Sequence, residues 1–479
     1  MTTEATLPRD RLLSKAHPGA ARGGLYRGWT MAAVGFVSVA LVFGTSVSAL
    51  PFIYSAVVAE FGWSLTEATL VFTYKNVASA AAALFLLGPL LERVGLRRLM
   101  TGSFITTGFG MGLFLSVDSL PTYYLAGAIL GFGTAAAMIG TNVFVSRWFY
   151  RNQGFAVGLA LTGASVGGMV FPVLTVTLIE SVGWRGAMAS LSLFIWLVAL
   201  PIYLWKAKEE PSVSDVGPEV DGSPGGGTGA RDAARAAPPS AQRLTAVCRT
   251  RRFWTISAAL LLVAAADAAM VQHTPLLLGA AGISPGLVAV GLSTMFAFGI
   301  VGKIAAGRLY DACSVRGMAL WNVLLAVSIA LALPVAGIPA LFVFAVVRGL
   351  AHGGLVPKPA VLAKHCFGPA LMSSVLPVLM GVWLLGAGIG PVALSMLVDA
   401  TGHYRHGTVL LVALSLLAAA LLRAAQAHQT RSSGTSKPSY ESSASDLGSA
   451  PAPRSMTACG SRSRTRSAAE RGSSAKPFP

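Results

Sequence analysis

The sequence predicts an all-α integral membrane protein with twelve transmembrane helices arranged as two six-helix pseudo-repeats. Of its 479 residues, 54% are hydrophobic and only 11% are charged, whereas a soluble globular domain has about 25% charged residues. Long apolar runs follow one another along most of the chain, and each is close to the length of about 20 residues that crosses a bilayer. Residues of matching chemistry also recur at one constant spacing. These observations exclude a soluble fold and indicate a duplicated membrane bundle.

The constant spacing is 219 residues, and it links the two halves of the chain position by position. Seven pairs share this offset: Gly88 and Gly307, Glu92 and Asp311, Arg97 and Arg316, Gly167 and Gly386, Pro172 and Pro391, Glu180 and Asp399, and Gly183 and Gly402. A single match carries little weight, but seven matches of residue chemistry indicate two copies of one unit. We therefore expect two helical halves related by an axis along the membrane normal.

The twelve predicted spans are apolar runs that end at polar or glycine-marked turns. In the first half they are residues 29–54, 67–89, 99–117, 121–146, 154–179 and 185–205. In the second half they are residues 253–279, 287–309, 317–336, 338–363, 371–398 and 407–427. The N-terminal half then comprises residues 27–206, and the C-terminal half comprises residues 251–427.

Three polar segments flank or join these halves. Residues 1–26 are polar and basic, and we expect them to form a cytosolic N-terminal segment. Residues 207–250 contain a run of Gly, Pro and Ser at 221–229, which favours a flexible cytosolic linker. Residues 428–479 are rich in Ser, Ala, Arg and Pro, and this composition is typical of a disordered cytosolic tail.

Lys and Arg are concentrated in every second loop. The loops around residues 93–98, 147–151, 206–252, 308–316 and 364 carry them, whereas the opposite loops carry only Arg185 and Arg405. The positive-inside rule places the first set of loops, and both termini, on the cytosolic side of the plasma membrane. The same rule accounts for the net charge of +17, so we predict the lipid bilayer, and no nucleic acid, as a partner.

Glycines repeat at helical spacing in spans five and eleven. Examples are Gly163 and Gly167 in the first half and Gly386 and Gly390 in the second. Small residues let helix backbones approach closely in lipid. The sequence leaves open whether these glycines serve packing alone or helices that slide between two states.

The charged turn between spans two and three resembles the signature of the major facilitator superfamily. It reads Gly88-Pro-Leu-Leu-Glu92-Arg93-Val-Gly95-Leu-Arg97-Arg98, with Glu92 where that family usually has Asp. The resemblance implies a conformational latch that pairs charges across an interface in one state and releases them in the other. Its residues would be Gly88, Glu92, Arg93, Gly95, Arg97, Gly307, Arg308 and Asp311. The alternative is that these charges serve topology alone.

Several short stretches resemble the monocarboxylate-transporter and oxalate/formate-antiporter branch of that superfamily. They are Arg27-Gly28-Trp29, Phe61-Gly62-Trp63-Ser64, Arg147-Trp148-Phe149, Gly183-Trp184-Arg185 and Gly388-Ile389-Gly390-Pro391. This resemblance covers residues 27–427 and implies transport of a small organic anion. Lys303 stands four residues before Gly307, where the branch often has a substrate-binding Arg. The usual acidic partner is replaced by Gly299, and residues 371–398 lack Lys and Arg, unlike the oxalate/formate exchangers.

Six ionisable residues are predicted to lie well inside the spans, where a charge costs roughly 2.5–3.5 kcal/mol. They are Lys75, Asp267, His273, Lys303, Arg348 and His352. Three cations against one carboxylate favour an anionic substrate, because a substrate carboxylate would neutralise the surplus. We expect Lys75, Lys303 and Arg348 to bind substrate and Asp267, His273 and His352 to carry protons.

Each of these residues also has a structural alternative. Arg348 can form an ion pair with Asp267, and Lys75 can donate to backbone carbonyls of a neighbouring broken helix. Lys303, like Lys358 closer to the membrane surface, can extend its amine to the inner boundary of the membrane. The two histidines can be packed and hydrogen-bonded helix residues.

The sequence therefore predicts a secondary active transporter of a small monocarboxylate or related organic anion, coupled to protons and working by alternating access. One alternative is a proton-coupled exporter of a drug or a larger acidic metabolite, and another is a non-transporting sensor that uses residues 428–479. No nucleophile–base set, metal-ligand cluster or phosphate loop occurs at a usable spacing. We accordingly predict neither an enzyme nor a cofactor.

Overall fold

A computed structural model describes residues 27–149, 153–208, 245, 247–335, 337–368 and 371–435. Within these residues the chain is almost entirely helical and contains no strand. The described residues up to Thr430 form one compact unit. The predicted segment 1–26, and nearly all of the predicted linker and tail, lie outside the described residues.

The N-terminal half is a bundle of helices that span residues 27–206. Its α-helices are α2 (Arg27–Phe43), α3 (Tyr54–Phe61), α4 (Leu65–Ala81), α5 (Leu87–Val94), α6 (Leu96–Gly112), α7 (Leu120–Ser146), α8 (Gln153–Phe194) and α9 (Leu200–Lys206). Short π- and 3₁₀-helical turns join several of them, as at η1 (Gly44–Ser48) and η2 (Leu50–Phe52). A capping box starts α4, where the Ser64 hydroxyl accepts from the Glu67 N–H and the Glu67 carboxylate accepts from the Ser64 N–H.

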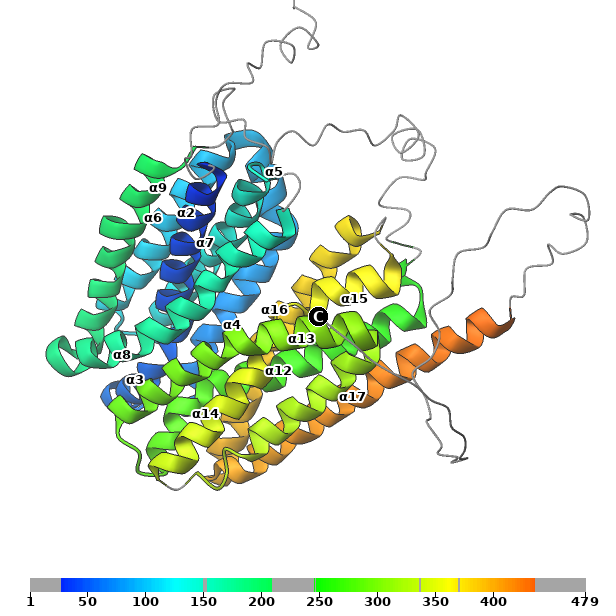
Figure 1. Ribbon diagram of the computed structural model, residues 1–479. Coiled ribbons are helices and arrows are strands. Elements are labelled where there is room, and N and C mark those ends of the chain that lie inside the picture. The colour runs from blue at the N-terminus through cyan, green and yellow to red at the C-terminus, as the bar shows by residue number, and fades with distance from the viewer. Residues whose placement is uncertain are drawn as a thin grey trace, which may run out of the picture. The chain divides into compact units, whose positions relative to one another are not determined.

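The C-terminal half repeats this helical organisation with fewer interruptions. Its helices are α12 (Arg251–Ala280), α13 (Pro285–Ala330), α14 (Ile338–Gly353), α15 (Lys358–Phe367), α16 (Met372–Thr401) and α17 (Tyr404–Thr435). Figure 1 shows the helices of the first half, which run from blue through cyan to green at α9, beside the green-to-orange helices of the second. Each half has its own large apolar core, and the halves meet mainly where α4 packs on α16 and α8 packs on α13.

The membrane-spanning character of the helices confirms the predicted fold class. Ten stretches of the described residues are long and apolar enough to cross a membrane. Two of them, Phe155–Lys206 with 52 residues and Pro285–Ala330 with 46 residues, are each long enough to cross twice. Each contains one residue with non-helical backbone, Gly183 or Ser314, at a predicted turn between two spans. The count of twelve spans stays a prediction.

The backbone also carries the 219-residue repeat. Gly95 has a φ of 79°, and Ser314, which stands 219 residues later, has a φ of 50°. Gly183 and Gly402, separated by the same offset, have φ values of 73° and 72°. Glycine adopts positive φ without a steric penalty, whereas serine does not. Ser314 therefore keeps a turn geometry that its counterpart achieves with glycine.

The glycines of spans five and eleven make close contacts inside each half. A Cβ atom at Gly167 in α8 would lie 2.1 Å from the carbonyl oxygen of Ala40 in α2. At Gly390 in α16, a Cβ atom would lie 2.0 Å from the carbonyl oxygen of Ala265 in α12. These glycines thus hold neighbouring helices of one half together, which supports the packing interpretation.

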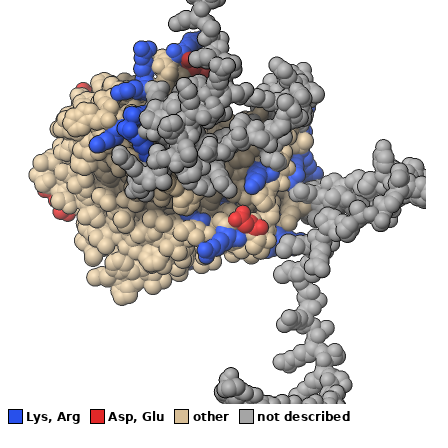
Figure 2. All heavy atoms as spheres, turned by 45° about the horizontal axis from the view of Figure 1, so that its top comes forward, with Lys and Arg blue, Asp and Glu red and all other residues tan. Residues whose placement is uncertain are grey.

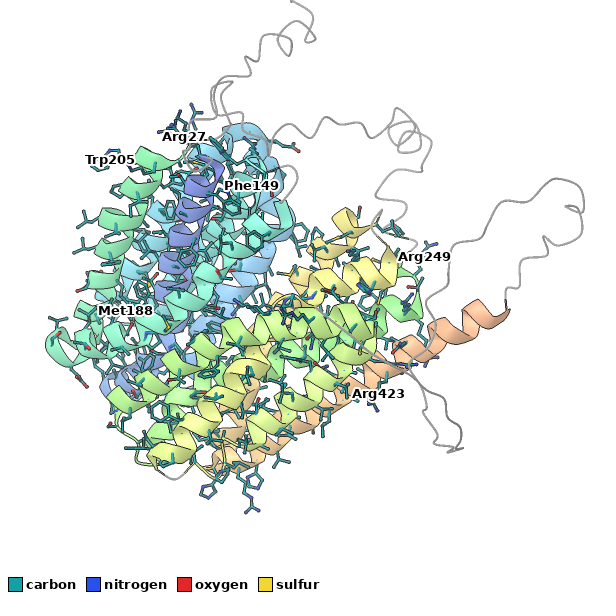
Figure 3. The ribbon with its side chains drawn as sticks, viewed as in Figure 1. Arg27, Phe149, Met188, Trp205, Arg249 and Arg423 are labelled. Carbon is teal, nitrogen blue, oxygen red and sulfur yellow. The ribbon has the colours of Figure 1, made fainter. Side chains whose placement is uncertain are left out.

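The two ends of the bundle are named here after the predicted orientation. The outer end contains α3 and the turn after α16, and the inner end contains α5 and α15 (Figure 1). Figure 3 places Arg27 and Trp205 at the inner end of the N-terminal half and Met188 toward the outer end. In the view of Figure 2, Lys and Arg of the described residues gather around the inner end, and the flank below is largely uncharged.

Candidate functional site

A buried cluster of charged residues lies inside the C-terminal half. Arg348 in α14 has no exposed surface, and its Nη2 donates to Asp267 Oδ1 in α12 at 2.5 Å and to the Asp267 carbonyl at 3.0 Å. His352 follows Arg348 by one helical turn, on the same face, and its Nδ1 lies 3.0 Å from Asp267 Oδ2. We call Asp267, Arg348 and His352 the central cluster.

Two donors of Arg348 are left without a partner. Its Nε and Nη1 are buried and form no hydrogen bond with any described residue. A buried donor without an acceptor costs about 1–3 kcal/mol, and more when it belongs to a charged group. The ion pair between Arg348 and Asp267, which the sequence left open as an alternative, is formed, but it uses only part of the guanidinium. The remaining N–H groups can donate to a second anionic group.

Lys75 is buried in the N-terminal half without a carboxylate partner. It lies in α4 with 3% of its surface exposed, and its Nζ sits 5.0 Å from the centre of the Phe72 ring. Within the described residues it forms no hydrogen bond or ion pair, so the expected alternative of donation to backbone carbonyls is not observed. A buried ammonium stabilised only by an aromatic ring keeps its capacity to bind an anion.

Lys303 points from the C-terminal half toward the N-terminal half. Its Nζ donates to the hydroxyl of Ser165 in α8 at 2.7 Å. Both residues lie on helices that form the interface between the halves. The side chain therefore reaches across the interface. Sequence reasoning missed Ser165, because a single serine in an apolar helix gives no pattern that marks a contact with the other half.

His273 is held apart from the central cluster by three residues of the same half. Its Nε2 lies 3.0 Å from the carbonyl oxygen of Pro391, and its Nδ1 lies 3.3 Å from the Tyr404 hydroxyl. A carbonyl only accepts hydrogen bonds, so Nε2 carries the proton and the Tyr404 O–H donates to Nδ1. Ser395 Oγ lies 3.2 Å from the same Nε2. Its geometry is that of a packed, hydrogen-bonded histidine.

Lys358 departs from its expected position. Extension of its side chain to the membrane surface was expected, and this is wrong, because Lys358 has no exposed surface. Its Nζ instead donates to Asn322 Oδ1 in α13, and Asn322 Nδ2 has no partner among the described residues. The orientation of α15 turns this lysine into the bundle, which its place in the sequence does not reveal.

A row of polar contacts joins the halves at the outer end. Asp399 Oδ2 in α16 accepts from the Thr66 N–H at 2.9 Å and from its hydroxyl at 2.6 Å. Further along α4, the hydroxyl of Thr69 lies 2.6 Å from that of Ser395. The hydroxyl of Thr73 donates to the Gly388 carbonyl at 2.7 Å. We call these contacts the outer contact; the three threonines share one face of α4.

One further hydrogen bond at this end adds to the outer contact. The Tyr54 hydroxyl donates to Gln272 Oε1 at 2.8 Å, from the N-terminal half to α12. In the middle of the interface, Phe43 and Phe296 approach edge to face with 6.5 Å between ring centres. Phe296 also packs on the His352 ring at 5.5 Å. The halves are thus closely joined from the outer end to the level of the central cluster.

The predicted latch residues at the inner end are not paired with one another. Gly95 makes the turn between α5 and α6 at positive φ, and Arg97 Nη2 donates to the Leu204 carbonyl at 3.3 Å. Among the described residues, the side chains of Glu92 and Asp311 form no ion pair or hydrogen bond. The structure therefore places these residues at one end of the bundle without joining them across the halves.

The described residues contain no group of three side chains that could hold a metal ion.

A profile of the Major Facilitator Superfamily matches residues 35–333. Monocarboxylate transporter 13 of Bos taurus is 30% identical over 347 residues, which are 71% of this chain and 75% of that protein. The Fujikurins efflux protein of Gibberella fujikuroi is 32% identical over 120 residues, covering 23% of this chain and 25% of the efflux protein.

The fold is also found among solved structures. The inward-facing, unoccupied structure of a bacterial homolog to the human lysosomal transporter Spinster superimposes with a TM-score of 0.65. It is 16% identical, and the match covers 85% of this chain and 98% of that one. This likeness concerns the fold alone.

Proposed function

The chain belongs to the Major Facilitator Superfamily, and we propose that it is a secondary active transporter of a small monocarboxylate or related organic anion. Transport is coupled to protons and proceeds by alternating access, in which the two halves rock around a site near the middle of the membrane. The curated relatives include monocarboxylate transporters, which supports this class of substrate.

The observation that carries the proposal is the incomplete pairing of Arg348. Its Nε and Nη1 are buried without acceptors, although its Nη2 is bonded to Asp267. With Lys75, Lys303 and Lys358, it makes four buried or partly buried cations against one carboxylate in the described spans. A substrate carboxylate supplies both the missing acceptor and the missing charge.

The position of Asp267 between a guanidinium and an imidazole supports proton coupling. Its carboxylate accepts from Arg348 and lies against His352 Nδ1. A proton taken up by Asp267 or His352 weakens the hold of Asp267 on Arg348, and the guanidinium is then free for the substrate anion. His273 stays a prediction for proton coupling; both of its ring nitrogens are occupied by Pro391 and Tyr404.

The latch assignment completes the cycle. The outer contact is formed, while Glu92 and Asp311 at the inner end have no partner among the described residues. This is the arrangement expected of a state that is closed outside and released inside. When the halves rock, the latch residues pair and the outer contact separates.

Export of a larger acidic metabolite is the second candidate. The same cations suit any organic anion. The similarity to a fungal efflux protein, which extends over 120 residues, favours export. A cationic drug is disfavoured, because the described spans of the N-terminal half contain no buried carboxylate.

Uptake into proteoliposomes tests the proposal. Radiolabelled acetate, lactate and pyruvate are offered under an inward and then a reversed pH gradient, and we expect uptake to follow the gradient. Arg348→Gln should lower uptake at least tenfold, whereas Arg423→Gln, which removes an exposed arginine of α17, should leave it unchanged. Undiminished uptake by folded R348Q would show that Arg348 does not bind the substrate. Absence of uptake by the wild type under both gradients would favour the larger metabolite.

A further inference from the structure

A cavity of about 480 Å³ lies between the two halves at the outer end. Its size falls within the roughly 300–1,000 Å³ of sites that hold small organic molecules. The walls are largely apolar and come from both halves, with Phe52, Val176 and Ile179 on one side and Pro275, Leu276 and Val288 on the other. Lys75, Lys303 and the central cluster do not line it, so it is separate from the proposed transport site.

Glu180 gives this cavity its charge. It is the one ionisable side chain among the lining residues, and its carboxylate is exposed and forms no ion pair or hydrogen bond with a described residue. Glu60, elsewhere at the outer end, differs because it is paired with Arg185. An apolar cavity with one unpaired carboxylate is complementary to a molecule with an apolar body and a single positive charge.

We propose that this cavity is a second binding site, for a hydrophobic ammonium ion. The apolar body fills the space between the halves, and the ammonium group pairs with Glu180. The ligand class is opposite in charge to the proposed substrate, so the site does not duplicate the transport site.

Binding here has a consequence for movement. Because the walls belong to both halves, a bound molecule contacts both halves at once. It therefore binds preferentially to the conformation in which the two halves are close together at the outer end. A ligand that binds one conformation shifts the equilibrium toward it in proportion to its differential affinity. Hydrophobic amines are therefore expected to hold the outer end closed.

Gly279 offers a way to fill the cavity without disturbing the helix. It lines the cavity near the end of α12, and a Cβ atom there meets nothing within 4 Å. Gly279→Leu therefore extends a side chain into open space. Gly158 in α8 is the matched control, because its Cβ position is equally open and it does not line the cavity.

The experiment measures binding of octylammonium to the purified protein in phosphatidylcholine nanodiscs, by the shift of its thermal unfolding midpoint with concentration. 1-Octanol and octanoate serve as neutral and anionic probes of the same length. We expect a saturable rise with octylammonium and a clearly smaller one with the other two. Glu180→Gln should weaken octylammonium about fivefold, the upper end for an exposed ion pair, and Asp118→Asn, at another exposed carboxylate, should not.

The cavity-filling variant provides an independent arm. Gly279→Leu should abolish the saturable shift, and Gly158→Leu should keep it. Equal shifts with octanol and octylammonium would indicate apolar filling of the kind a lipid chain also provides, and would overturn the proposal. So would full binding by folded E180Q and G279L. If G279L does not fold, the E180Q titration decides alone. None of these readouts needs a transport substrate, so the result is independent of the transport assay.

Discussion

Replacing Asp267 with Asn tests how the central cluster is held together. The change keeps the size of the side chain but removes the charge that lies 2.5 Å from Arg348 Nη2. Arg348 has no exposed surface and stays charged, so the protein is left with an uncompensated cation. Breaking one partner of a buried ion pair costs about 3–5 kcal/mol, and we expect Asp267→Asn to lose that much stability.

The double variant Asp267→Asn/Arg348→Gln removes both charges and should be markedly more stable than Asp267→Asn alone. Replacing a whole buried ion pair by neutral groups is often close to neutral, because the desolvation cost of both ions disappears. Equilibrium unfolding in mixed micelles, followed by circular dichroism, measures both variants against the wild type.

Added acetate tests whether the guanidinium of Arg348 can bind a carboxylate in the Asp267→Asn variant. A small carboxylate that enters the site of Asp267→Asn can accept from the freed guanidinium, so acetate should stabilise that variant and not the double variant. If Asp267→Asn unfolds within about 0.5 kcal/mol of the wild type, the range of an ordinary surface substitution, the reasoning is refuted. Equal stabilisation of both variants by acetate would refute it too.

Three further predictions concern local geometry, and the same unfolding assay checks each. Ser314→Gly should raise the free energy of unfolding by about 1 kcal/mol, because serine holds a φ of 50° there; Ser314→Ala should give no such gain, and an equal gain would point away from backbone strain. Gly167→Ala should destabilise the protein, since its Cβ would lie 2.1 Å from a backbone oxygen, whereas Gly158→Ala, in open space, should be tolerated; equal effects would contradict the close contact. Hydrogen bonds from Arg185 and Trp184 lower the pKa of Glu60, so its contribution to the free energy of unfolding is present above the unfolded pKa of about 4.3 and is lost as pH falls through the lower folded value. Glu60→Gln should make the fall in stability at acid pH less steep. An unchanged fall would show that Glu60 is not its source.

The repeat was readable from the sequence because it rests on residue types with strong backbone preferences. A glycine-marked turn that recurs at one spacing predicts two similar turns, and the positive φ values at Gly183 and Gly402 agree with this prediction. The membrane spans were readable for a similar reason, since length and composition alone select them. Within the described residues, these two signals were sufficient to predict the helical membrane fold.

The partners of buried polar groups could not be read in the same way. The depth of Lys358 along its helix suggested contact with the surface, but the rotation of α15 about its axis decided that it meets Asn322. Threonine hydroxyls in helices commonly donate to a backbone carbonyl of the preceding turn. The presence of Thr66 and Thr73 in α4 therefore did not indicate that they contact the other half. Such pairings depend on how helices of different halves face each other, which periodicity does not encode.

The strength of the outer contact is matched to the movement that the proposed cycle requires. It comprises five hydrogen bonds between the halves, counting two at Asp399, one each at Thr69 and Thr73, and one from Tyr54. At about 0.6–1 kcal/mol each, they sum to about 3–5 kcal/mol. A two-state equilibrium moves from 1:99 to 99:1 for about 5.5 kcal/mol. The ion pairs that we propose for Glu92 and Asp311 at the other end, together with substrate on Arg348, would therefore be sufficient to offset the outer contact.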